Sequence, residues 1–280
     1  MIGRRRWLGL AATVALAPAI AQAQGPLVVF AAASLKNALD EIAADWARTT
    51  GRPAARIRFA SPHPRHTGER LIEAIQHLPH VCKHLHLPVQ SGSNRILKAM
   101  RRRHTREDYL ALLDRIRERI PGVTLSTDMI VGFPGETRED FEDTLSLTER
   151  AQFISMFSFK YSPRPNTLAS KRLPDDVTEE EKTSRIVQLQ TLQREIQSRL
   201  HQQMVGTHVD VLIDSVSRRR DGELSGRTSG NVVVNFPPPS EGEPSKVGQL
   251  RRVRIERAGD RKSTRLNSSH SQQSRMPSSA

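Results

Sequence analysis

The feature that most constrains the fold of this sequence is a change of hydrophobic period near Gly206. Before it, from Arg56 onward, short β-branched runs alternate with segments whose apolar residues recur at helical spacing. After it, apolar residues recur at every second position between turns rich in Gly and Pro. The first pattern predicts an α/β unit with parallel strands, and the second predicts a small antiparallel β-barrel.

The α/β unit is expected to be a parallel (β/α) barrel or part of one. Polar or glycine-rich loops follow two of its strands: Gln90 and Ser91 follow one, and residues 132–136 follow the other. Ligands of parallel β/α folds bind at the carboxyl ends of the strands, so these loops are candidate site loops. Thr105, Thr137 and Thr178 each precede acidic residues and predict the starts of three helices.

Four sequence blocks support a closer comparison. They are HLHLPVQSGS, STDMIVGFPGET, SFKYSPRPNT and GELSGRTSGNVVVNF, beginning at residues 84, 126, 158 and 222. In this order they closely resemble the tRNA 2-methylthio-adenosine synthases, which are radical-SAM methylthiotransferases with a C-terminal TRAM domain. The resemblance implies addition of a methylthio group to C2 of N6-isopentenyladenosine beside the anticodon. It also implies tRNA as partner, a cytoplasmic location, and S-adenosylmethionine with two [4Fe-4S] clusters as cofactors.

The resemblance also suggests which residues line the sites. Candidates for the S-adenosylmethionine pocket are Gln90, Ser91, Arg102, Gly132, Pro134, Gly135 and Glu136. On loop chemistry alone, the glycines and the proline could equally serve only to turn the chain. Candidates for tRNA contact in the small barrel are Arg218, Arg219, Arg220, Arg227, Arg251 and Arg252, with Arg254 beside them. Such arginines set affinity for phosphates, although a solvated charged rim explains any one of them as well.

Cysteine content limits the chemistry. Cys82 is the only cysteine in 280 residues, whereas an iron-sulfur cluster that leaves one iron open needs three thiolates. The sequence as written is therefore expected to be inactive unless completed, and a non-catalytic tRNA-binding module is the first alternative. His80, Cys82, His84 and His86 alternate along one predicted strand, but two-residue spacing is not the usual zinc pattern. No metal site is predicted there.

The two ends of the sequence differ from its middle. Arg4–Arg6, an apolar run too short to span a membrane, and Ala21-Gln22-Ala23 are typical of a secretory signal over 1–23. Residues 24–60 resemble the start of periplasmic molybdate-binding proteins, with Ser34 as an oxyanion-binding residue, and this gives the second alternative function. Residues 260–280, which begin DRKSTRLNSSH, are interpreted as a disordered tail translated from a sequencing adapter.

The expected organisation is thus a truncated chimera in five parts. Residues 1–23 are a signal peptide that would direct export, and 24–60 are a fragment of a periplasmic binding protein. Residues 61–204 form the C-terminal part of a radical-SAM barrel, 205–259 form a TRAM domain, and 260–280 are the tail. The net charge of +13, from 43 basic and 30 acidic residues, suits an RNA partner without proving one. No stable protein partner is inferred.

Overall fold

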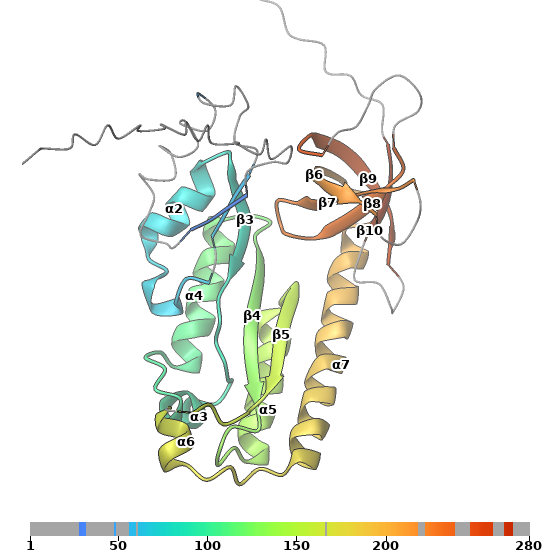
Figure 1. Ribbon diagram of the computed structural model, residues 1–280. Coiled ribbons are helices and arrows are strands. Elements are labelled where there is room, and N and C mark those ends of the chain that lie inside the picture. Colours follow the sequence, from blue (N-terminus) through green and yellow to red (C-terminus); the bar gives the residue numbers. More distant parts are fainter. Residues whose placement is uncertain are drawn as a thin grey trace, which may run out of the picture.

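The computed structural model describes residues 28–31, 48, 56–59, 61–165, 167–217, 222–238, 247–259 and 266–270. They form a parallel sheet with helices packed against it and a small closed barrel, joined by one long helix, α7 (Figure 1). Ser34, Arg218, Arg219 and Arg220, and the apolar run of the expected signal, lie outside the described residues.

The sheet contains five parallel strands in chain order. They are β1 (Val28–Ala31), β2 (Arg56–Phe59), β3 (Val81–His86), β4 (Thr124–Val131) and β5 (Ser155–Lys160). Strands that follow one another around a sheet are typical of (β/α) barrels, whereas a doubly wound sheet reverses its order. The described residues therefore form an open five-stranded part of the expected barrel, with β1 and β5 at its edges.

Three of the helices begin where the sequence predicts, after Thr105, Thr137 and Thr178. The helices are α2 (Glu69–His77), α3 (Asn94–Ala99), α4 (Arg106–Arg119), α5 (Arg138–Ala151), α6 (Leu168–Arg172) and α7 (Glu179–Gln203), with a 3-10 turn at Pro64–His66. Thr105 and Thr137 form complete capping boxes with Asp108 and Asp140. The Thr178 hydroxyl accepts the Glu181 N–H at the start of α7. These bonds satisfy backbone donors that a helix leaves unpaired at its first turn.

The main core lies between the sheet and the helices on one of its faces. Ile57, Leu85, Leu125 and Met129 of the strands are buried against the apolar sides of α2, α4, α5 and α7. The buried Tyr109 hydroxyl donates to the carbonyl oxygen of Leu87 at 2.8 Å. Because strand side chains alternate, the residues between these core positions lie on the opposite face, which we call the open face.

The second unit is a barrel whose strands run in the order β10-β8-β7-β6-β9. They are β6 (His208–Val216), β7 (Leu224–Thr228), β8 (Val233–Phe236), β9 (Leu250–Ala258) and β10 (Leu266–His270). The interior is filled by the buried side chains of Val211, Ile213, Val234, Phe236 and Val253.

The structure corrects two expectations about this barrel. The pairs of β6, β7, β8 and β9 are antiparallel, but β10 runs parallel to β8. The strand β10 also lies in a segment for which the sequence predicts no regular structure. Backbone groups on the edges of β8 and β9 can pair with any extended segment, because the ladder needs no apolar side chains.

The barrel contacts the amino ends of the sheet strands. The Arg58 guanidinium donates to the carbonyl oxygens of Thr228 at 2.8 Å and Ser229 at 3.2 Å. The Lys83 N–H donates to the Ser229 hydroxyl at 2.9 Å, and the Thr124 hydroxyl donates to the Gly230 carbonyl at 2.7 Å. One short turn of the barrel, 228–230, is thus hydrogen-bonded to β2, β3 and β4.

Candidate functional site

The carboxyl ends of β3 and β4 bring several of the predicted cofactor residues together. Gln90 lies beside Met129 in an isolated parallel bridge, and its carbonyl oxygen accepts the Ile130 N–H at 2.9 Å. The backbone of Gln90 has a φ of 81°, which is costly for a residue other than glycine. Strained residues of this kind concentrate at ligand sites, so Gln90 fits a binding role better than a packing role.

The loop after β4 is held by its own carboxylate. The Gly132 N–H donates to Glu136 Oε2 at 2.6 Å, and the Arg185 guanidinium of α7 donates to the same oxygen at 2.7 Å. Burial raises the pKa of Glu136, and the bonds from Gly132 and Arg185 oppose that rise. Glu136 Oε1 is buried and has no hydrogen-bond partner within the described residues.

The two glycines of this loop have different surroundings. Gly132 has a φ of 70°, and a side chain there would overlap Lys182 of α7. Gly135 has a φ of 76°, its N–H donates to the Asp176 carboxylate at 2.6 Å, and a side chain there would touch only the end of Arg95. Both positions need glycine for the turn, which agrees with the interpretation that these residues serve only to turn the chain. Of the two, only Gly135 has open space beside its Cα. Pro134, between them, is buried.

The remaining cofactor candidates are Ser91 and Arg102. Ser91 is fully buried, and its hydroxyl accepts the Ser93 N–H at 3.2 Å. Arg102 is half-buried, and burial lowers its pKa while the carboxylate of Asp128 opposes the effect. The structure thus places Gln90 beside β4 and residues 132–136 directly after that strand, while the charge of Arg102 interacts with Asp128 of the open face.

Sequence reasoning missed the polar side chains of the open face. His84 and His86 of β3 and Thr124, Ser126 and Asp128 of β4 are joined by hydrogen bonds. The alternation of His84 and His86 along one strand is the sequence signal that indicates a shared face. In the sequence it was interpreted only as a possible zinc pattern. Within the described residues, no group of three or more His, Cys, Asp or Glu side chains is arranged to hold a metal ion.

Two aromatic side chains lie on the same open face. Phe157 and Phe159 of the edge strand β5 are 58% and 51% exposed. The Phe157 ring meets the His86 ring edge-on, with 5.9 Å between centroids. Large exposed aromatics next to polar groups are typical of surfaces that contact a ligand or another segment.

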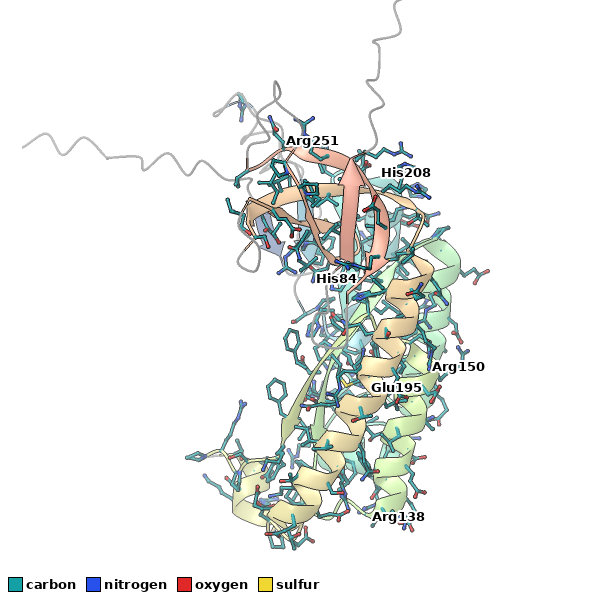
Figure 2. All side chains as sticks on the ribbon, turned by 90° about the vertical axis from the view of Figure 1, so that its right-hand side faces the viewer. His84, Arg138, Arg150, Glu195, His208 and Arg251 are labelled. Atoms are coloured by element: carbon teal, nitrogen blue, oxygen red, sulfur yellow. The ribbon has the colours of Figure 1, made fainter. Side chains whose placement is uncertain are left out.

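The predicted RNA surface of the barrel is divided. Arg252 and Arg254 point outward from β9, opposite Asp210 and His208 of β6. Arg251 pairs with the buried Val211 and therefore lies on the other side of its strand (Figure 2). Arg227 lies 3.4 Å from the Asp214 carboxylate and donates to Asn231 at 3.2 Å. Arg252 and Arg254 are thus exposed on the outside of the barrel, whereas Arg227 is paired with Asp214.

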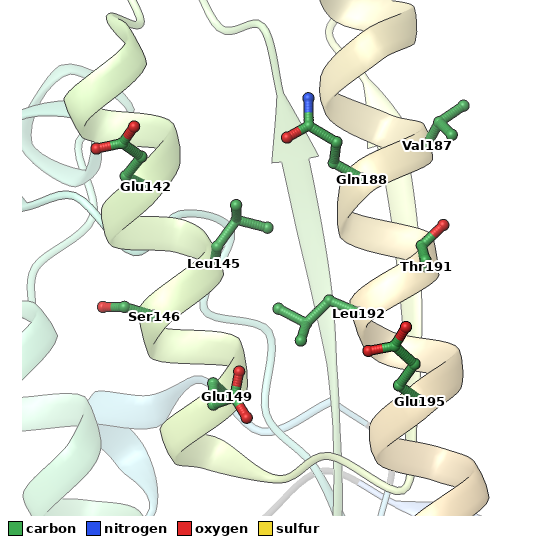
Figure 3. Close-up of a pocket in the computed structure, with 9 residues that line it drawn as sticks. All are labelled: Glu142, Leu145, Ser146, Glu149, Val187, Gln188, Thr191, Leu192 and Glu195. Carbon is green, nitrogen blue, oxygen red and sulfur yellow. The ribbon is translucent and has the colours of Figure 1, made fainter.

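Two hollows lie away from these residues. A groove of about 590 Å³ runs between α5 and α7; Leu145 and Leu192 point toward one another across it, and Glu142, Glu149, Glu195 and the exposed Val187 also line it (Figure 3). A cleft of about 660 Å³ lies where α7, the amino end of β4 and the barrel meet. Neither contains a predicted cofactor or RNA residue.

Comparison with known proteins decides the family. A profile described as the Radical SAM superfamily matches residues 2–148, which is more than half of the chain. The chain belongs to the radical SAM superfamily. The match includes residues 24–60, the segment that resembles the start of periplasmic molybdate-binding proteins. A TRAM domain profile matches residues 202–263, so the C-terminal barrel is a TRAM domain.

Curated relatives share one name, tRNA-2-methylthio-N(6)-dimethylallyladenosine synthase. The protein from Flavobacterium johnsoniae is 43% identical over 205 residues, which cover 73% of this chain and 42% of the relative. That from Acetivibrio thermocellus is 46% identical over 200 residues, covering 71% and 41%. That from Chlorobium chlorochromatii is 50% identical over 184 residues, covering 66% and 41%. The chain spans about two-fifths of the length of these relatives.

Among solved structures, the chain is similar to the coproporphyrinogen III oxidase HemN from Escherichia coli, a radical SAM enzyme. That similarity has a TM-score of 0.46 at 15% identity and covers 72% of this chain and 51% of HemN. As to membranes, none of the helices in the described part of the chain is both long and apolar enough to cross one.

The described residues do not fit both cofactors of the family equally well. Cys82 is fully buried on β3, and burial raises the pKa of its thiol, which disfavours the thiolate that iron requires. One buried thiol does not fit a [4Fe-4S] cluster. For S-adenosylmethionine, the strained Gln90 and the open side of Gly135 fit a ligand at the carboxyl ends of β3 and β4.

Proposed function

We propose that this chain is part of a tRNA methylthiotransferase that modifies C2 of N6-isopentenyladenosine beside the anticodon. The observation that carries the proposal is the 43–50% identity to curated relatives that share one name. The radical SAM and TRAM matches support it, because they combine a domain of an enzyme superfamily with a domain suited to RNA binding.

Gln90 and the Gly135 region would hold S-adenosylmethionine at the strand ends. When bound, that cofactor supplies the methyl group and the radical that the family uses. The other residues of the loop would hold its shape. The Glu136 carboxylate accepts hydrogen bonds from the Gly132 N–H and from Arg185 of α7, and so attaches the loop to α7. No step through an iron-sulfur cluster is assigned to this chain, since its single thiol does not fit one.

The chemical part of the proposal is tested by completing the chain. Residues 61–259 would replace the matching part of the Flavobacterium johnsoniae relative, in a bacterial strain that lacks its own methylthiotransferase. Mass spectrometry of digested tRNA should then detect the methylthio nucleoside. The unmodified relative is the positive control. A chimaera that is soluble yet yields only isopentenyladenosine would refute the assignment.

The RNA part is tested on the whole chain. An anticodon stem-loop should bind with an affinity that falls steeply with salt, and R252A with R254A should reduce the salt slope by about 2. The matched control is Arg138→Ala, because Arg138 is an exposed arginine on α5, paired with Glu142. If the wild-type chain and the variant with both R252A and R254A had equal salt slopes, β9 would not be part of the RNA-binding surface. Salt-dependent binding without activity of the chimaera would favour the non-catalytic binding module.

A further inference from the structure

The cleft of about 660 Å³ is bounded by both units of the molecule. The sheet unit contributes Leu125 of β4, the long helix α7 contributes Leu200, and the TRAM domain contributes Val209 of β6 and the turn 228–230. Small-molecule sites have volumes of about 300–1,000 Å³ and are concentrated at domain interfaces. The size and the position of this cleft are therefore those of a ligand site.

One wall of the cleft is apolar. Ile154 and Val232 are buried in the core of the barrel, and the side chains of Leu200, Met204 and Val209 pack against that core. These three side chains are only partly buried, so they present apolar surface to the cleft. Covering apolar surface releases about 25 cal/mol per Å². A flat, weakly polar group is thus stabilised against this wall.

The rest of the lining carries more positive than negative charge. Arg56, Arg117 and Arg150 line the cleft, and Asp210 is the acidic side chain among the described lining residues. Asp114 lies just outside, where its carboxylate accepts from Arg150 at 2.8 Å and 3.1 Å and its charge also acts on Arg117. One carboxylate therefore serves two guanidinium groups.

Arg117 is the less well neutralised of the two. Its side chain is half-buried, and it donates to the uncharged carbonyl oxygen of Ala151. Burial lowers the pKa of Arg117, the Asp114 carboxylate opposes that effect, and repulsion by Arg150 lowers the pKa further. An anion beside these two arginines relieves the repulsion. Phosphate oxygens match the planar fork of a guanidinium group especially well.

An amide completes the set of groups. Gln203 is exposed at the last position of α7 and lines the cleft beside the apolar wall. A glutamine amide presents a donor and an acceptor side by side, which pair with the edge of a nucleobase. A fatty anion would match the wall and the charge, but it has no group for this amide.

We propose that the cleft binds a mononucleotide, with its phosphate at Arg117 and Arg150 and its base against Leu200, Met204 and Val209. Arg56 adds positive charge to the same cleft. The chemistry recognised is a phosphate joined to a flat base, which a free nucleotide and a nucleotide within an RNA strand both supply. Because both units line the cleft, the bound nucleotide holds them together.

This site is separate from the candidate cofactor loops. The cleft lies at the amino end of β4, whereas residues 132–136 follow its carboxyl end. The eight residues of β4 extend over about 25 Å. The inference therefore does not rest on the proposed function, and its test requires neither a cofactor nor activity.

The test is titration calorimetry of the whole chain with adenosine monophosphate (AMP), adenosine and ribose 5-phosphate at low salt. AMP should bind, and adenosine should bind at least about tenfold more weakly because it lacks the phosphate. Arg150→Ala should weaken both phosphate ligands about tenfold. The matched control is Arg138→Ala, because Arg138 and Arg150 are both exposed arginines of α5 that are paired with a carboxylate.

A second variant tests the base. Gln203→Ala should weaken AMP about threefold and leave ribose 5-phosphate unchanged, because only the base reaches the amide. Gln188→Ala is its control, since Gln188 is an exposed glutamine of α7 that donates to the Ser184 hydroxyl. AMP should also raise the melting temperature of the wild-type chain more than that of Arg150→Ala. The melts without ligand show that each variant is folded.

Three results would overturn the proposal. They are no binding of AMP at millimolar concentration, AMP binding that Arg150→Ala leaves unchanged, and ribose 5-phosphate binding as tightly as AMP. A competition then identifies the source of the nucleotide. If an anticodon stem-loop displaces AMP, the cleft holds a nucleotide of the RNA strand. If AMP binds equally with and without saturating stem-loop, the ligand is a free nucleotide.

Discussion

At the scale of single residues, packing against another element decides which glycines are replaceable. Gly132 and Gly122 have nearly the same backbone, with φ of 70° and 74°, but only Gly132 is covered by a side chain, that of Lys182. The Lys182 side chain is itself 2% exposed and bonded to the carboxylates of Asp175 and Glu179 at 2.8 Å and 3.1 Å. It cannot move aside without exposing or losing those partners.

We therefore expect Gly132→Ala to destabilise the protein by about 2–4 kcal/mol, from a left-handed alanine of about 1 kcal/mol plus overpacking. Gly122→Ala, with nothing near its Cβ, should cost only about 1 kcal/mol. Urea unfolding of the two variants measures the difference. Equal losses would show that Lys182 does not constrain the loop.

Buried histidine makes the fold sensitive to acid. The pKa of His84 is depressed from 6.5 to about 3, so the unfolded chain gains a proton below pH 6.5 that the folded chain does not. The stabilising contribution is complete above pH 6.5 and is lost as the pH falls toward 3. Between pH 7 and pH 4 the loss is up to about 3 kcal/mol from this ring.

Melting temperatures across that pH range should therefore fall, and His84→Asn should flatten the curve. Burial lowers the pKa of His104 and His201 in the same direction, so some acid sensitivity should persist in the variant. A His84→Asn curve parallel to the wild type would assign the effect to those other histidines.

At the scale of elements, helix starts were predictable because they depend on neighbours in sequence. The boxes at Thr105 and Thr137 need only a hydroxyl and an acid three residues on, and both are confirmed. The helix α6 was missed because it is five residues long and has no buried residue to give it a period. Strand β10 was missed because its pairing depends on distant edges rather than on its own residues.

We expect Thr105→Ala to destabilise the protein by about 1 kcal/mol, because the Asp108 N–H loses its acceptor at the start of α4. Thr105→Ser retains the hydroxyl and should cost only a few tenths of that. Guanidinium unfolding separates the two variants. If alanine and serine cost the same, the loss comes from the threonine methyl group and not from the cap.

At the scale of the whole molecule, the two units were predictable but their contact was not. The change of hydrophobic period near Gly206 lies between the end of α7 and the start of β6. Nothing in the sequence pairs Arg58 with residues 228 and 229, which lie about 170 positions away. The candidate site shows the same limit. The loops at the strand ends follow from local pattern, whereas the hydrogen bonds between the side chains of β3 and β4 on the open face require two strands in register.

Arg58 should link the unfolding of the units. Its buried guanidinium donates to two carbonyl oxygens of the TRAM domain, so Arg58→Ala should cost about 2–3 kcal/mol by removing both bonds, although the Thr228 oxygen keeps the Asn231 N–H as a donor. Scanning calorimetry should then resolve two transitions in place of one. Arg58→Lys supplies fewer donors, so its loss of stability should lie between zero and that of Arg58→Ala. A single transition in the alanine variant would show that α7 and the hydrogen bonds of Lys83 and Thr124 couple the units without Arg58.

The position of β5 has a practical consequence for handling the protein. Its outer edge has backbone groups that pair with no strand among the described residues, and Phe157 and Phe159 are exposed on it. Such an edge is a template for the strand of a neighbouring chain. Light scattering from this chain should rise with concentration, and a lysine at Phe159 should suppress it. Because of the same unpaired edge, strands supplied on a separate polypeptide could pair with β5 and extend the sheet.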